Sequence, residues 1–203
     1  MKLLYVTDRA AIGDSAFARI LDALAGAPGL SVQLREKLTP DHDVLEQARW
    51  ARERLGPDVA LYVNRRFDVA LAARAAGVHL PADGLPVTRV RSETPRGFRI
   101  GVSAHAPEQA RDAIAAGADL VVLGPIFDTP SKRAFGAPLG PGALASLPRL
   151  EEHASEVYVI GGIDEERLPA LEQYADRISG IAAVRLFQES SDPRAVAGRI
   201  VER

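Results

Sequence analysis

The stretch Ala115-Ala116-Gly117-Ala118-Asp119-Leu120-Val121-Val122-Leu123 decides the fold that we predict for this chain. It combines the end of a helical pattern, one glycine and an uninterrupted apolar run. Glycine favours the left-handed conformation that ends helices, and a continuous apolar run is typical of a parallel strand buried on both faces. The stretch therefore predicts a junction between a helix and a buried parallel strand.

Two further stretches repeat this junction, Ala-Ala-Gly-Val-His-Leu at 75–80 and Ser-Gly-Ile-Ala-Ala-Val at 179–184. Outward from the three junctions, short apolar runs alternate with helical patterns along the chain. The predicted strands are 2–8, 31–37, 59–64, 77–80, 99–105, 120–125, 157–163 and 180–186. The predicted helices are 14–24, 41–55, 67–75, 107–115, 141–147, 165–173 and 193–201, and residues 85–95 are assigned to neither pattern.

Eight alternating strands predict an α/β fold, a single compact (β/α)8 TIM barrel that spans residues 1–203 as one domain. The length of 203 residues is near the lower limit of ~200 for this fold, which implies short loops. An open doubly wound sheet is the alternative. That fold would require a glycine-rich turn after the first strand, where the chain has Thr7-Asp8-Arg9-Ala10-Ala11.

The composition excludes several classes of protein. With 25 basic and 27 acidic side chains the net charge is −2, so no overall field attracts nucleic acid or an acidic membrane surface. The absence of cysteine excludes disulfides and thiolate metal sites. No signal peptide, membrane span, Walker loop, His-Glu-x-x-His or Gly-x-Ser-x-Gly motif is recognised. We expect a cytoplasmic protein with no nucleic-acid or membrane partner, and the sequence is compatible with a homo-oligomer.

Polar residues interrupt the second predicted strand. Gln33, Arg35 and Lys37 alternate with other residues and therefore point to one face. If that face is the barrel interior, unpaired charges would be costly there, so an anion such as phosphate is the expected partner. The alternative is an exposed edge strand. Asn64, at the end of the third strand, either orients a ligand or closes a turn.

Three later segments offer further candidates. Ser103 and His105 share a face of the fifth strand, where they either bind a ligand and shuttle protons or cap the next helix; His79, at the end of the fourth strand, is more often a packed residue. The long loop after the sixth strand carries Thr129, Ser131 and Lys132. This loop is either a clamp that closes on a ligand or a plain loop exposed to solvent. Gly161 and Gly162, with Val184 and Arg185 after them, are typical of a phosphate cradle at the last two strands of such barrels.

Four motifs, at 33–37, 101–105, 124–132 and 161–163, together resemble the thiamine phosphate synthase and thiazole tautomerase (TenI) superfamily, whose fold is a (β/α)8 barrel. The resemblance implies that Gln33, Arg35, Lys37 and Asn64 hold the pyrophosphate of a pyrimidine substrate, with Ser103 near it. It also implies that Thr129, Ser131, Lys132, Gly161 and Gly162 bind phosphate groups.

The chain departs from the synthase pattern at two positions. Synthases carry metal-binding carboxylates after strands three and four, where this chain has Arg65 and Gly84; Asp83 would substitute only in a shifted register. A hard cation normally requires oxygen ligands from the protein, so synthase activity, which would require Mg²⁺, is placed in doubt.

Pro81, after the fourth strand, is more similar to the tautomerase branch, although the histidine of that branch is Pro125 here. The resemblance therefore implies a metal-independent tautomerase that acts on a carboxythiazole phosphate, with a phosphorylated thiazole as its partner and no cofactor. With Pro125 in place of the histidine of that branch, His105 or His79 would have to serve as the acid/base, or that function is lost, and we take His105 as the proton carrier. The alternatives are a thiamine phosphate synthase and a non-catalytic protein that binds thiazole phosphate.

Overall fold

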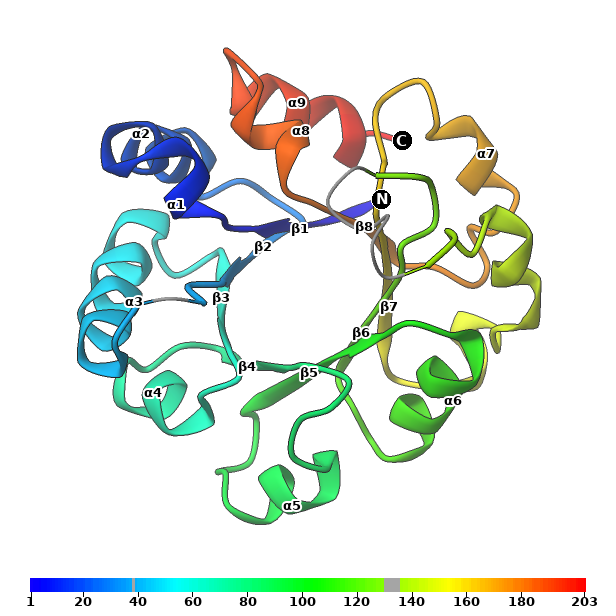
Figure 1. The fold of residues 1–203 in the computed structure, drawn as a ribbon, viewed down its shortest axis with the longest axis horizontal. Helices are drawn as coiled ribbons and strands as arrows, with labels where there is room; N and C mark the ends of the chain where they lie inside the picture. Colours follow the sequence, from blue (N-terminus) through cyan, green and yellow to red (C-terminus); the bar gives the residue numbers. More distant parts are fainter. Residues whose placement is uncertain (38, 130–135) are drawn as a thin grey trace. The chain divides into compact units, whose positions relative to one another are not determined.

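The computed structural model describes residues 1–37, 39–129 and 136–203 (Figure 1). Its strands follow one another in chain order as those of a closed parallel barrel, which confirms the predicted (β/α)8 fold over the open sheet. They are β1 (Lys2–Val6), β2 (Leu30–Leu34), β3 (Ala60–Asn64), β4 (Gly77–Leu80), β5 (Arg99–Ala104), β6 (Leu120–Leu123), β7 (Glu156–Ile160) and β8 (Gly180–Ala183).

Helices occupy most of the connections between strands. The α-helices are α1 (Arg9–Ile12), α2 (Asp14–Leu24), α3 (Asp41–Leu55), α4 (Phe67–Ala72), α5 (Val87–Ser92), α6 (Pro107–Ala115), α7 (Pro169–Glu172), α8 (Arg185–Gln188) and α9 (Pro193–Val201), and two 3₁₀ helices are η2 (Pro141–Ser146) and η3 (Leu150–Glu152). The prediction missed α1, α5, α8 and η3, and it gave the last strand three residues too many. Val184 adopts a helical conformation, which ends β8 and starts α8.

The chain forms two compact units, Met1–His79 with Ala183–Arg203, and Leu80–Ala182. The single domain expected from the sequence remains a prediction. No helix among the residues that the structure describes is long and apolar enough to cross a membrane.

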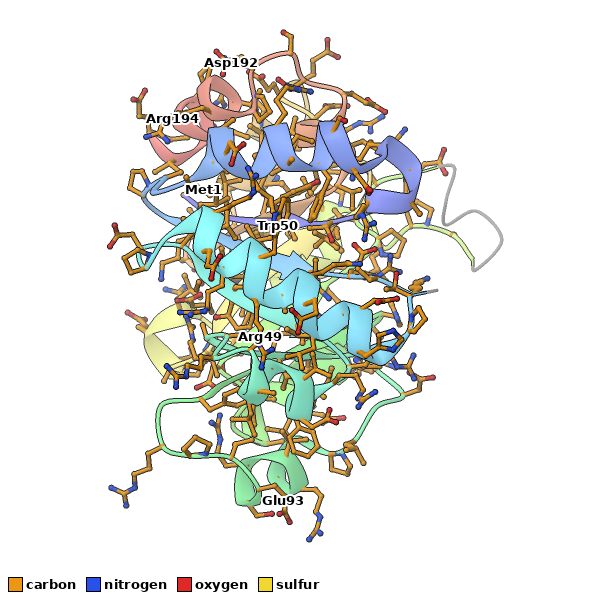
Figure 2. The ribbon with its side chains drawn as sticks, turned by 90° about the vertical axis from the view of Figure 1, so that its left-hand side faces the viewer. Met1, Arg49, Trp50, Glu93, Asp192 and Arg194 are labelled. Carbon is orange, nitrogen blue, oxygen red and sulfur yellow. The ribbon has the colours of Figure 1, made fainter. Side chains whose placement is uncertain are left out.

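In the first unit, α2, α3 and α4 follow one another along the outside of β1, β2 and β3 (Figure 1). Phe17 of α2 stacks on Trp50 of α3 with ring centroids 5.7 Å apart, and the Arg54 guanidinium lies 4.5 Å from the Trp50 ring centre. Helix α9 begins at Pro193. The residue before it, Asp192 (labelled in Figure 2), accepts the Ala195 N–H with its side chain at 3.0 Å. This cap and Pro193 in the first turn are the start signals that favour a helix here.

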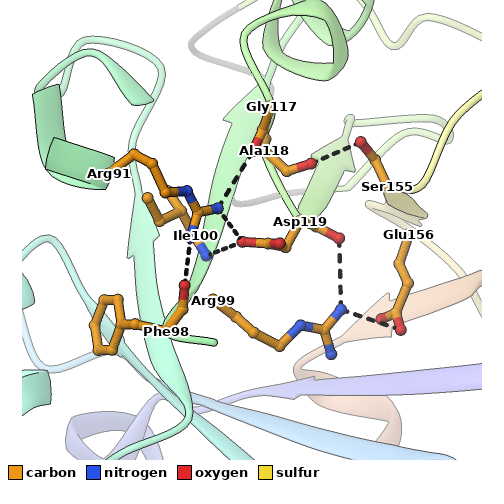
Figure 3. Close-up of polar contacts among 9 residues, drawn as sticks. All are labelled: Arg91, Phe98, Arg99, Ile100, Gly117, Ala118, Asp119, Ser155 and Glu156. Carbon is orange, nitrogen blue, oxygen red and sulfur yellow. Dashed lines mark hydrogen bonds and ion pairs between the residues drawn. The ribbon is translucent and has the colours of Figure 1, made fainter. Parts of the chain in front are cut away.

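In the second unit, a polar network ties together the amino-terminal ends of β5, β6 and β7 (Figure 3). Asp119 accepts hydrogen bonds from the Arg91 guanidinium at 2.5 Å and from the Ile100 N–H at 2.7 Å. Arg99 pairs with Glu156 at 3.1 Å. This network lies at the end of the strands opposite to the one that carries active sites in such barrels, so we assign it to stability.

Candidate functional site

Gln33 of β2 and Asn64 of β3 form a direct side-chain pair. Gln33 is 4% exposed, and its Nε2 donates a hydrogen bond to Asn64 Oδ1 at 3.2 Å. Gln33 lies opposite Tyr62 in the strand register, and Asn64 shares the face of Tyr62 because it is two residues further along. The sequence therefore placed these two amides correctly at the carboxyl ends of neighbouring strands.

Arg35 follows β2 directly and is half-buried. Its backbone N–H donates to the hydroxyl of Thr7 at 2.9 Å, but among the described residues its guanidinium makes no hydrogen bond or ion pair. Burial lowers the pKa of Arg35, and the charge of Asp8 partly offsets this effect. A half-buried cation without a bonded partner is the feature of this unit that most clearly suits an anionic ligand.

Lys37 lies outside the strand to which the sequence pattern assigned it. The predicted strand extends to Lys37, but β2 ends at Leu34 and Lys37 is exposed. The reason is that the Arg35 N–H bonds to a side chain, the Thr7 hydroxyl, instead of continuing the backbone ladder. Thr7 also donates to Glu36 Oε1 at 3.3 Å and is fully buried, and sequence reasoning missed this residue. The only available signal was a hydroxyl at the end of an apolar strand.

His79 of β4 lies opposite Asn64 in the strand register and is 1% exposed. Burial, followed by the positive charge of Arg35, lowers the pKa of His79 to about 3. The imidazole is therefore neutral at physiological pH, and it is unsuited to donating a proton by passing through its charged form.

We expect this buried histidine to make folding sensitive to acid. Between pH 6.5 and 3 the unfolded chain binds a proton at His79 that the folded chain does not, so stability falls as the pH is lowered through this window. At pH 5 the loss reaches about 2 kcal/mol relative to pH 7. Urea denaturation at the two pH values measures it. The variant His79→Asn should lose this part of the pH dependence, and the exposed-site control His42→Asn should keep it.

The turn after β3 carries two arginines with different surroundings. Arg65 has the left-handed φ of 65°, and its N–H donates to the His79 carbonyl at 2.8 Å. Its side chain is exposed. Arg66 is paired with Asp68 through two hydrogen bonds of 2.8 and 2.6 Å. The charge of Arg66 is thus neutralised locally.

In the second unit, His105 follows β5 and is exposed. Its Nδ1 lies 3.0 Å from the Gly124 carbonyl, which assigns the proton to Nδ1 and leaves Nε2 as the available ring nitrogen. The His105 backbone N–H donates to Gln109 of α6 at 2.7 Å. Ser103 is half-buried on β5.

The glycines after β6 and β7 allow two loops to approach each other closely. A Cβ at Gly161 would lie 2.5 Å from Pro125, and one at Gly162 would lie 2.5 Å from the Asp128 carbonyl oxygen. Both glycines have positive φ values, 104° and 64°, which end β7 earlier than predicted. Loop packing therefore accounts for both glycines, and their phosphate contacts remain a prediction.

The structure describes three of the other predicted phosphate ligands. Thr129 is 6% exposed. Val184 precedes α8, and Arg185 is the exposed first residue of that helix. Ser131 and Lys132 lie outside the described residues.

Comparisons with known proteins show which proteins this chain is similar to. The family model described as thiamine monophosphate synthase matches residues 3–187. A putative thiamine-phosphate synthase of Geobacter sulfurreducens is 38% identical over 195 residues, which are 95% of this chain and 89% of that protein. A thiamine-phosphate synthase of Methanoculleus marisnigri is 38% identical over 98% of this chain and 94% of its own length. The thiamine phosphate pyrophosphorylase structure from Pyrococcus furiosus has a TM-score of 0.80 at 25% identity, and the match covers 99% of this chain and 94% of that one.

Proposed function

Because this chain belongs to the thiamine monophosphate synthase family, we propose that it is a thiamine-phosphate synthase. In this reaction the bond between a pyrimidine methylene carbon and its pyrophosphate breaks. The ring nitrogen of a thiazole phosphate forms the new bond to that carbon with its lone pair, and pyrophosphate leaves. The relatives reported above are named as synthases, so this reaction takes precedence over the tautomerase expected from the sequence.

The half-buried guanidinium of Arg35, whose charge adds to burial in lowering the pKa of the nearby His79 ring, is the observation that carries this proposal. The amide pair Gln33 and Asn64 lies at the ends of β2 and β3. Negative charge grows on the leaving pyrophosphate as its bond breaks. A guanidinium offers two parallel N–H donors to such an anion, and partial burial strengthens these hydrogen bonds. Arg35 would therefore bind the pyrophosphate and stabilise its departure, while the neighbouring amides orient it.

The proton chemistry of these residues also supports a synthase. Neither bond change of the coupling reaction requires a proton carrier, because the attacking nitrogen has a free lone pair and pyrophosphate leaves as an anion. His79 is neutral and buried, and it is unsuited to moving protons. A tautomerase, in contrast, must take a proton from one ring atom and return one to another.

The test is to incubate the purified chain with the pyrimidine pyrophosphate and the thiazole phosphate, and to measure thiamine phosphate by chromatography. Assays run both with Mg²⁺ and with EDTA. We expect product in proportion to protein, and no product above the protein-free control in either buffer would overturn the proposal.

A thiazole tautomerase is the second candidate, and the free Nε2 of His105 favours it. The ring is fixed through Nδ1 at the carboxyl end of β5, where a proton carrier would be placed. Aromatisation of the carboxythiazole phosphate, followed by ultraviolet absorbance, tests this candidate, and His105→Gln should abolish it. Binding of thiazole phosphate without turnover in either assay would favour the non-catalytic alternative.

A further inference from the structure

The magnesium ion implied by the resemblance to synthases does not fit the side chains at the ends of β2, β3 and β4. Mg²⁺ requires oxygen ligands in octahedral geometry, usually with one or two carboxylates. These strand ends present a guanidinium, two amides and a neutral imidazole. The Asn64 Oδ1 already accepts a hydrogen bond from Gln33. In the described part of the chain, no group of three histidine or acidic side chains could hold a metal ion.

Two carboxylates near these strand ends, those of Glu36 and Asp68, have partners of their own. Glu36 accepts the Thr7 hydroxyl, and burial raises its pKa, which disfavours its charged form. Asp68 is held in its two-fold contact with Arg66. Burial lowers the pKa of Arg35 and the charge of Asp8 partly offsets this shift, so one carboxylate acts on the Arg35 donors.

Arg65 places a second positive charge at the end of β3. The residue directly follows Asn64, and its backbone is fixed by the hydrogen bond from its N–H to the His79 carbonyl. A non-glycine residue with a positive φ is uncommon and costs conformational energy, so a turn that keeps one has a constrained geometry. Unlike Arg66, Arg65 makes no ion pair with a described residue. Together, Arg35 and Arg65 would repel a divalent cation and attract a multiply charged anion.

We propose that Gln33, Arg35, Asn64 and Arg65, which we call the β2–β4 cluster, bind a pyrophosphate group directly, without a bridging divalent cation. The identity of the anion rests on the proposed function, because pyrophosphate is the group that leaves in the synthase reaction. The binding mode rests on the donors themselves. Guanidinium groups and amides take the role that a metal ion and its carboxylates would otherwise have.

Titration calorimetry with inorganic pyrophosphate tests this inference, in one buffer with EDTA and in another with excess Mg²⁺. We expect the dissociation constant in EDTA to be no weaker than in Mg²⁺, because the metal would compete with the protein for the same phosphate oxygens. Arg35→Gln should weaken binding in EDTA by at least about tenfold. Arg49→Gln, on the exposed face of α3, is the matched control and should bind as the native chain does.

A second variant reverses the charge at the turn. Arg65→Asp places a carboxylate after Asn64, so pyrophosphate should bind more weakly in EDTA, and Mg²⁺ should restore part of the affinity. Thermal unfolding of each variant shows whether it is folded before titration. Native binding that is at least about tenfold tighter in Mg²⁺ than in EDTA overturns the inference, and so does a lack of pyrophosphate binding in both buffers.

These outcomes separate the inference from the proposed function. Pyrophosphate binding that is independent of metal, without formation of thiamine phosphate, supports the binding mode and rejects the synthase. Formation of thiamine phosphate together with Mg²⁺-dependent pyrophosphate binding supports the synthase and rejects the binding mode.

Discussion

Replacing Arg35 with glutamine lowers kcat/KM for thiamine phosphate formation by about 10²- to 10³-fold, the range expected when a preorganised donor to a developing anion is removed. Glutamine keeps a polar side chain of similar length but removes the positive charge and the two parallel donors. The loss should be largest in the chemical step, because the charge on pyrophosphate increases as its bond to carbon breaks. Initial rates over a range of both substrates measure the effect.

Two controls accompany the Arg35 variant. The hydrogen bond to Thr7 uses the backbone N–H of Arg35, so Arg35→Gln should unfold at the same urea concentration as the native chain. Arg35→Lys keeps the charge without the fork of donors and should fall between the native chain and Arg35→Gln. If Arg35→Gln retains activity within about threefold of the native chain, its donors have no role in the transition state.

Replacing Gly124 with alanine destabilises the fold by about 3 kcal/mol or prevents folding, as overpacking does in a tightly packed interior. An added Cβ would lie 2.2 Å from the Ile160 carbonyl oxygen and 2.7 Å from the Ile160 Cγ2. Ile160 cannot move away freely, because its carbonyl accepts the Ile126 N–H at 2.8 Å. Urea denaturation measures the difference in the free energy of unfolding.

Gly142→Ala is the matched control for this prediction. Gly142 lies in η2 of the same unit, its φ is not positive, and a Cβ there would meet no atom within 4 Å. Its free energy of unfolding should change by no more than about 0.5 kcal/mol. Equal stability of Gly124→Ala and the native chain would show that the loops after β6 and β7 are free to separate.

Local sequence patterns were sufficient to predict the order of strands and the barrel. Of the three junction glycines, Gly117 has the expected left-handed φ of 84°, whereas Gly77 and Gly180 are the first residues of β4 and β8 and have no positive φ. The prediction succeeded because buried parallel strands need continuous apolar runs, which follow all three glycines. The same patterns misjudged where strands end. They extended the second strand to Lys37, whereas β2 ends at Leu34 because a side chain from another strand, Thr7, takes the next backbone N–H.

For the candidate site, the sequence by itself determined which kinds of side chain stand at the strand ends, since Gln33 lies in the apolar run that forms β2 and Asn64 ends the run that forms β3. Only the tertiary structure decided how they are paired and charged. It joined Gln33 to Asn64, left the Arg35 guanidinium without a bonded partner among the described residues, and buried His79 as a neutral ring. The physical reason is that partners and pKa values depend on burial and on neighbours distant in the chain, which the spacing along one strand does not encode.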